Sequence, residues 1–161
     1  MSHEINAIIY ASDVHEGSRS AFRVAVRQAV KHQAEIIYVH ALDKVNKITP
    51  DVSQSLLPKN IEQDHSQQHK EAQIAGIKKR IHRFVDTELS SLEQLPTFSV
   101  CIRFGVPEEV IVQASQQFGA GMIVMGNRKV SALSRVFLGS TAQKVLQKSE
   151  VPVLIVPLKT K

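Results

Sequence analysis

The stretch GMIVMGNRKVSALSRVFLGST, residues 121–141, decides the fold of this chain. It opens with the apolar run 121–125, which Gly126 follows directly, and it closes on GST at 139–141, ahead of a second apolar run, VPVLIV at 151–156. Short apolar runs of this kind are typical of buried strands, and a glycine just after one lets the backbone approach a ligand. A Gly-Ser-Thr that opens a helix offers free N–H groups and two hydroxyls to an anion. The stretch therefore predicts a strand, an anion-binding loop, a helix and a further strand.

The same alternation of strands and helices runs through the whole chain. Apolar runs predict five strands, at 5–11, 35–42, 98–104, 121–125 and 151–156. Helical spacing predicts four helices, the first after Ser18, the second from about residue 69 to Pro96, the third from Pro107 and the fourth at about 140–149. The apolar stripes of the last three helices include Leu92, Phe118 and Leu146, which we expect to be buried. Residues 43 to about 68 lose the apolar pattern, so we predict a long flexible loop there.

Strands alternate with helices along the chain, and three of the strands are nearly continuous apolar runs. These features indicate an α/β fold, in which an open, doubly wound, five-stranded parallel sheet carries helices on both faces. In such folds ligands bind beyond the carboxyl ends of the strands, at the point where the strand order reverses. Asp13, after the first strand, and Gly126, after the fourth, emerge at that point.

Length and composition bound the remaining possibilities. The 161 residues, 43% of them hydrophobic and 22% charged, predict one soluble domain over 1–161. No apolar run approaches the roughly 20 residues of a membrane span, and residues 1–4 do not read as a secretion signal, so we expect no membrane association. The single cysteine, Cys101, excludes an intramolecular disulfide and fits a cytoplasmic protein, in which it would be a buried structural thiol.

Charge and histidine patterns give weaker signals. The net charge of +5 includes a basic cluster formed by Lys78, Lys79, Arg80 and Arg83. No aromatic residues interleave with this cluster, so we interpret it as a solvated helix face, and nucleic-acid binding is not expected. His65 and His69 share metal-ligand spacing but lie in a Gln-rich polar stretch, so we predict a solvated surface and no metal site.

Several motifs resemble the universal stress protein family, and together they cover almost the whole chain. They are YASD at 10–13, YVHA at 38–41, GVPEE at 105–109, the Met-Gly loop at 125–126 and VPVLIV at 151–156. Nucleotide-binding members of that family carry Gly, two residues, Gly, nine residues, then Gly-Ser or Gly-Thr. This chain keeps that spacing with Gly126, Gly139 and Ser140, but Lys129 stands where the second glycine should be.

The resemblance implies strand order 3-2-1-4-5 and a site for ATP or ADP, with Mg²⁺ present only alongside the nucleotide. It places Asp13 and Ala41 near the base and ribose. The residues that it places around the ribose and phosphates are Gly126, Asn127, Arg128 and Lys129. The residues that it places on phosphate oxygens are Gly139, Ser140 and Thr141.

Each of these residues also has a structural interpretation. Asp13 and Ser140 are common helix caps, and Gly126 could serve a positive φ. Lys129 either obstructs the site or pairs with phosphate, and Arg128 beside it could add a bidentate contact. We interpret His40, near the end of the second strand, as a hydrogen-bonded core or site-wall histidine.

Three functions remain open. The first is an ATP-binding stress-response module that acts through an unidentified protein partner. The second is an interaction dimer of the same family that binds no nucleotide. The third is a slow ATP hydrolase or autophosphorylating protein. Asp13 is the only acid placed in the predicted site, and no Gly-x4-Gly-Lys-Ser/Thr loop occurs, so we assign no catalytic residues and do not expect a dedicated enzyme.

The fifth strand predicts a homodimer. In strand order 3-2-1-4-5 it forms a sheet edge that is apolar and uncharged, formed by Val153, Leu154, Ile155 and Val156. Open edges of this kind template association through their unpaired N–H and C=O groups. The simplest closure is a two-fold contact between the same strand of two copies, and the family resemblance points the same way.

Overall fold

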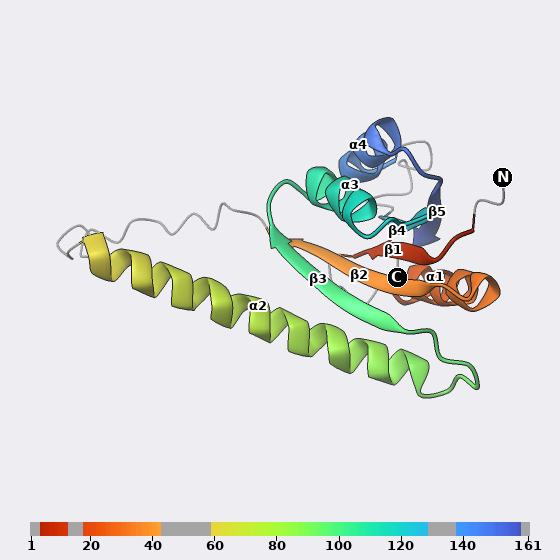
Figure 1. Ribbon diagram of the computed structural model, residues 1–161, viewed down its shortest axis with the longest axis horizontal. Helices are drawn as coiled ribbons and strands as arrows, with labels where there is room; N and C mark the ends of the chain where they lie inside the picture. Colours follow the sequence, from red (N-terminus) through yellow and green to blue (C-terminus); the bar gives the residue numbers. More distant parts are fainter. Residues whose placement is uncertain (1–3, 13–17, 43–58, 129–137, 159–161) are drawn as a thin grey trace.

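The computed structural model describes residues 4–12, 18–42, 59–128 and 138–158, with only the backbone described at 59–66 and 128. Strands and helices alternate along the chain, as Figure 1 shows. The elements are β1 (Ala7–Ala11), α1 (Arg19–His32), β2 (Glu35–Leu42), α2 (Lys59–Leu89), β3 (Phe98–Phe104), α3 (Pro107–Gln117), β4 (Met122–Arg128), α4 (Ser140–Lys148) and β5 (Val153–Leu158).

The five strands form one sheet in the order β3-β2-β1-β4-β5, and all the neighbouring pairs are parallel. Both the predicted fold class and the predicted strand order are therefore confirmed. Tyr10 of β1 pairs with Tyr38 of β2 on one side and with Val124 of β4 on the other. The strand order reverses between β1 and β4, so the carboxyl ends of these two strands are where a ligand site is expected.

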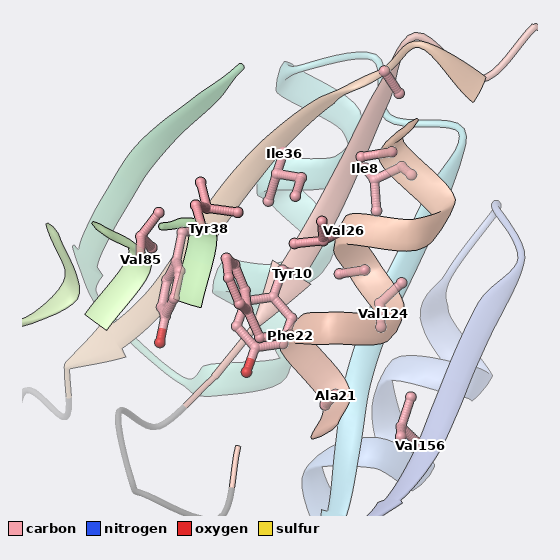
Figure 2. Packing of buried hydrophobic residues seen from close by; sticks show 14 of the residues in the cluster. Ile8, Tyr10, Ala21, Phe22, Val26, Ile36, Tyr38, Val85, Val124 and Val156 are labelled. Carbon is pink, nitrogen blue, oxygen red and sulfur yellow. The ribbon is translucent and has the colours of Figure 1, made fainter. Parts of the chain in front are cut away.

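Side chains alternate between the two faces of the sheet and build a separate core on each. On one face Tyr10 and Tyr38 pack against Phe22 of α1 and Val85 of α2, and the rings of Tyr10 and Tyr38 meet edge to face with centroids 4.9 Å apart (Figure 2). On the other face residues such as Ile9 and Val39 pack against α3 and α4. Helices therefore cover both faces, as the apolar runs predicted. Cys101 of β3 is buried in the second core as a free thiol.

Helix α2 is longer than predicted. It begins at Lys59, so residues 59–68 of the predicted loop are helical, and residues 43–58 of that loop lie outside the described part of the chain. These first turns lack apolar spacing but are rich in Lys, Glu and Gln, which favour helix without needing a core, and Pro58 precedes them in the sequence. Figure 1 shows this end of α2 projecting past the sheet, while Ile81, Val85 and Leu89 near its other end are buried.

Three residues expected in the core are exposed instead. Leu92 is 40% exposed because α2 ends three residues earlier, at Leu89. Phe118 is 38% exposed because it follows the end of α3, whose buried apolar side is formed by Val110, Ile111 and Ala114. Leu146 is 42% exposed because the buried side of the short helix α4 is formed by Ala142 and Val145. None of the helices in the described ranges is long and apolar enough to cross a membrane.

Candidate functional site

A cavity of about 330 Å³ lies at the carboxyl ends of the central strands. Val39, Ala41 and Met125 contribute apolar wall from β2 and β4, and Ile111 contributes it from α3. Polar atoms come from Ser12, His40, Asn127, Ser140 and Thr141. Apolar walls with a few converging polar groups, in a cavity of a few hundred cubic ångströms, are typical of small-molecule sites.

Six of the residues predicted to bind nucleotide line this cavity. They come from three separate segments of the chain and are Ala41, Gly126, Asn127, Gly139, Ser140 and Thr141. Asp13 and Lys129 lie outside the described residues. Arg128 is described by its backbone alone, which ends β4 opposite Leu158 of β5.

Gly126 lies inside a strand and not in a loop. β4 was predicted to end at Met125, but it continues to Arg128, and Gly126 pairs with Val156 of β5. Gly126 is not among the described glycines with positive φ, so that interpretation of it was wrong. A Cβ added at Gly126 would lie 2.6 Å from Cδ1 of Leu158. The missing side chain therefore makes room for Leu158, which itself lines the cavity.

The first turn of α4 faces the cavity. Its N-cap residue is Gly139, with φ −56° and ψ 152°, which has no side chain to cap the helix, so the interpretation of Ser140 as the cap was wrong. The backbone O of Gly139 accepts the N–H of Gln143 at 3.0 Å. The first N–H groups of a helix have no partner within it, and here they belong to residues that line the cavity. This end of α4 can therefore receive an anion.

Asn127 joins the end of β4 to the start of α4. The backbone N–H of Gly139 donates to Oδ1 of Asn127 at 3.2 Å, across 12 residues of chain. Asn127 is half-buried and lines the cavity. Its side chain therefore fixes the position of the α4 N-terminus relative to the sheet.

His40 joins the ends of β1 and β2. Its Nδ1 lies 2.8 Å from the backbone O of Ser12, and because a carbonyl can only accept, Nδ1 carries the proton. The backbone N–H of Ser12 donates in turn to the O of Val39 at 3.2 Å. These two bonds hold the chain as it leaves β1. His40 is half-buried, hydrogen-bonded and lines the cavity, which agrees with the interpretation of it as a core or site-wall histidine.

An ion pair joins the start of α3 to α4 beside the cavity. Glu108 is buried, and its Oε1 lies 3.2 Å from Nζ of Lys144. The pKa of Glu108 lies below its usual value of 4.5, chiefly because of the backbone hydrogen bond at the helix start and then because of Lys144. Lys148 and Glu109 form a second, longer contact of 4.0 Å between the same helices. The buried carboxylate of Glu108 is thus paired with a cation.

Sequence reasoning missed several residues of the cavity. Tyr10 and Ser12 could have been found as neighbours of Asp13 at the end of β1. Pro107 and Ile111 begin α3, and Leu158 lies past the predicted end of the fifth strand, so no local signal linked them to a site. Within the described residues no cluster of three or more His, Cys, Asp or Glu side chains could hold a metal ion. His69 is exposed, and the side chain of His65 lies outside the described set.

Comparison with known proteins agrees with the motifs. The model of the universal stress protein family matches residues 4–157. The universal stress protein in the QAH/OAS sulfhydrylase 3′ region of Thermus aquaticus is 30% identical over 151 residues, covering 92% of this chain and 96% of that protein. Among solved structures, universal stress protein UspA from Lactobacillus plantarum has a TM-score of 0.70 at 21% identity, covering 95% of this chain and 98% of that one.

Two further structures of the same fold contain ligands. A universal stress protein in complex with cAMP has a TM-score of 0.64 at 19% identity, covering 96% of this chain and 98% of its own. The universal stress protein from Archaeoglobus fulgidus in complex with dAMP has a TM-score of 0.59 at 17% identity, covering 94% and 97%. The family match over nearly the whole length and the Thermus relative decide the assignment. This chain belongs to the universal stress protein family.

Proposed function

We propose that this chain is an adenine-nucleotide-binding stress-response module. The observation that carries the proposal is the meeting of Ala41, Gly126–Asn127 and Gly139–Thr141 around one cavity. The family resemblance implied a nucleotide at these segments, and the fold brings them together at the reversal in strand order. Such a position suits a ligand that has both an apolar ring and an anionic end.

The chemistry of the cavity suggests how the ligand lies. The base fits against the apolar walls near Val39, Ala41 and Ile111, where a planar ring loses little by leaving water. The phosphate fits at the first turn of α4, where N–H groups and the helix dipole favour negative charge. In this proposal Asp13 lies near the ribose, and Arg128 and Lys129 lie near the phosphates. Mg²⁺ enters only with the nucleotide.

The structural neighbours support an adenine ligand. cAMP and dAMP share an adenine base, a pentose and a single phosphate, and the proteins that carry them have the fold of this chain. The volume of about 330 Å³ lies near the lower end of the range for small-molecule pockets, which is enough for a ligand of this size. ATP and ADP add further phosphates, to which the proposal assigns Arg128 and Lys129.

Titration calorimetry with ATP, ADP and AMP tests the proposal. Binding should release or absorb heat and raise the unfolding temperature, because a ligand that binds only the native state stabilises it. Mass spectrometry of the denatured protein, purified without added nucleotide, reports any ligand it already carries. Absence of heat, thermal shift and co-purified nucleotide would refute an adenine-nucleotide site.

The second part of the proposal is a homodimer through β5. This strand pairs with β4 alone in the sheet, and Val153, Leu154 and Ile155 along it are only half-buried. An apolar edge strand without charged residues is an uncommon surface to leave open. Pairing with the same strand of a second copy satisfies its free backbone groups by a two-fold contact.

One observation favours the alternative of an interaction dimer without nucleotide. The space beside Gly126 is filled by Leu158, so the presence of this glycine is explained by packing without any ligand. The same titration separates the two functions, since the alternative requires a dimer that gives no heat with any adenine nucleotide. No Asp or Glu occurs among the described residues that line the cavity, so the proposal assigns binding and no catalytic role to them.

A further inference from the structure

The charged side chains of the helices are divided unevenly between the two sides of the sheet. Figure 1 shows α1 and α2 on one side of the sheet, with α3 and α4 on the other. The charged residues of α3 and α4 balance, because Glu108 pairs with Lys144 and Glu109 with Lys148. The described side chains of α1 and α2, at 19–32 and 67–89, include nine Lys or Arg but only three Asp or Glu. The excess positive charge of the described helices therefore lies on the side of α1 and α2.

Helix α1 carries a row of cations along its outer face. The row is formed by Arg19, Arg23, Arg27 and Lys31, all of which are exposed, and α1 contains no acidic residue. Residues four positions apart lie on the same face of a helix, so the four positions follow one line about 18 Å long. The opposite face of α1 is apolar and buried against the sheet. The row is therefore held by a rigid element and faces solvent.

Helix α2 joins this row through an ion pair and a ring contact. Glu88 of α2 lies between the first two arginines, with Oε1 3.3 Å from Nε of Arg19 and Oε2 3.0 Å from Nε of Arg23. Its side chain is only 5% exposed, so this carboxylate is covered while both guanidinium groups remain more than half exposed. One turn earlier, Phe84 meets Phe22 of α1 edge to face with ring centroids 5.2 Å apart. The two helices thus contact each other and share one outer surface.

The cations of α2 extend this surface. Arg80 lies one turn before Phe84 and so on the flank that turns toward α1, and Lys79 and Arg83 beside it are exposed. The α2 cluster considered alone indicates a solvated helix face, but the fold adds the α1 row next to it. We call the combined surface the basic face, and define it by Arg19, Arg23, Arg27, Lys31, Lys79, Arg80 and Arg83. Five of these seven residues are arginine, whose planar guanidinium matches phosphate with two parallel donors.

We propose that the basic face binds the phosphate backbone of a double-stranded nucleic acid without reading its sequence. A duplex keeps its bases stacked inside and presents closely spaced phosphates, which cations attract whatever the sequence. A single strand is held instead on exposed aromatic rings, but Phe22 is buried and Phe84 is packed against it. This binding site lies outside the cavity and does not depend on the proposed nucleotide.

The composition of the basic face favours a duplex over two other anionic partners. A folded protein partner needs apolar anchors at the centre of the interface, but none of the exposed large hydrophobic side chains among the described residues lies on α1 or α2. A membrane-binding helix inserts its apolar face into the lipid, and that face of α1 is already buried against the sheet. Interfaces with duplexes are polar and strongly positive, as this surface is.

Fluorescence anisotropy with a labelled duplex DNA of about 20 base pairs tests the proposal. We expect a micromolar dissociation constant at 50 mM salt that rises at least about tenfold at 200 mM, because bound phosphates release counterions. A second duplex of unrelated sequence should bind within about twofold of the first, and a single strand of the same length should bind more weakly. Vesicles that contain anionic lipid and a polyglutamate peptide are the competing partners.

Two double substitutions locate the binding to the basic face. Arg27→Gln with Lys31→Gln changes α1, and Arg80→Gln with Arg83→Gln changes α2, and neither pair includes a residue bonded to Glu88. Each double variant should weaken duplex binding at least about fivefold and reduce the salt dependence, as expected for loss of phosphate contacts. The unfolding temperature of each variant reports whether the fold is retained.

Arg103→Gln with Lys148→Gln is the matched control. It removes the same number of cations from the opposite side of the sheet, where Arg103 donates to Gln117 of α3 and Lys148 belongs to α4. The affinity for the duplex should stay within about twofold of the wild type. Equal losses in the control and in the two basic-face variants would show that net charge alone drives binding, which overturns the assignment to this face.

Two further outcomes would also overturn the inference. One is the absence of duplex binding by the wild type at 50 mM salt, and the other is tighter binding to the vesicles or the peptide than to the duplex. None of the residues substituted in the two basic-face variants lines the cavity, so these variants should keep the wild-type response to ATP. Failure of the basic-face proposal therefore leaves the proposed nucleotide site untouched, and the reverse also holds.

Discussion

Leu158 of β5 occupies the space that a side chain at Gly126 of β4 would need. An added Cβ would lie 2.6 Å from Cδ1, 2.8 Å from Cγ and 3.0 Å from Cδ2 of Leu158. Leu158 is buried in the core that β1, α1 and α2 share, and it also lines the cavity. The absence of a side chain at Gly126 therefore allows Leu158 of the edge strand β5 to pack beside the cavity.

Gly126→Ala should destabilise the protein by about 1–3 kcal/mol, because Leu158 must leave its place in a packed core. Gly76→Ala is the control, since nothing lies within 4 Å of the Cβ it would add on the exposed part of α2. That change should stabilise the protein by about 0.5–1 kcal/mol through helix propensity. Urea unfolding at neutral pH measures both values. Equal effects of the two substitutions would contradict the role given to Leu158.

Gly139→Val should abolish binding of phosphorylated ligands while the fold remains. The backbone of Gly139 has a negative φ that other residues adopt, and among the described residues an added Cβ would lie within 4 Å of Oδ1 of Asn127 alone, at 3.9 Å. A branched side chain there would cover the first N–H groups of α4, so the ATP affinity should fall at least about tenfold, as for loss of charge-assisted hydrogen bonds.

Calorimetry with ATP and adenosine checks this prediction, with Gly139→Ala as the smaller matched change. The alanine variant should keep more of the ATP affinity than the valine variant. Retention of wild-type ATP affinity by Gly139→Val would show that phosphate binds away from α4.

Stability should decrease in acid through Glu108. Its pKa is lowered in the folded state, first by the backbone hydrogen bond at the α3 start and then by Lys144. The folded protein thus holds the charged form more strongly than the unfolded chain does. The stabilisation is present above the usual pKa of 4.5 and is lost as the pH falls below it, through the lowered folded value.

Urea midpoints between neutral pH and pH about 3 should therefore fall less steeply for Glu108→Gln than for the wild type. Glu109→Gln is the control, because Glu109 and Lys148 are about half exposed and 4.0 Å apart, and exposed pairs contribute little. If Glu108→Gln and the wild type lose stability in parallel, the acid sensitivity arises elsewhere.

Charged substitutions on β5 test the proposed dimer interface. Light scattering should give about twice the chain mass of 17.9 kDa for the wild type, and Val153→Lys with Ile155→Lys should give the monomer mass. Ser99→Lys on β3, at the opposite edge of the sheet, should leave the dimer intact. Circular dichroism checks that each variant is folded. A wild-type monomer at micromolar concentration would exclude this dimer.

The sequence by itself determined the layers, and the resemblance of its motifs to a known family added the strand order and the expected place of the site. Buried parallel strands are continuous apolar runs, and this local signal located β2 and β3 at the bounds that the structure has. The family resemblance then placed Ala41, Gly126 and Gly139 around one ligand. Their meeting follows from the strand order, since β1 and β4 lie side by side where it reverses.

Only the tertiary structure decided what individual side chains do. Gly126 and Leu158 are 32 positions apart, and Asn127 and Gly139 are 12 apart, so no local period relates them. The same limit explains the wrong burial predictions at Leu92, Phe118 and Leu146. The apolar helical spacing includes these residues, but they lie beyond the part of each helix that a neighbouring element covers. Periodicity reports which face of a segment is apolar, whereas packing against distant segments decides which of its residues are covered and which line a site.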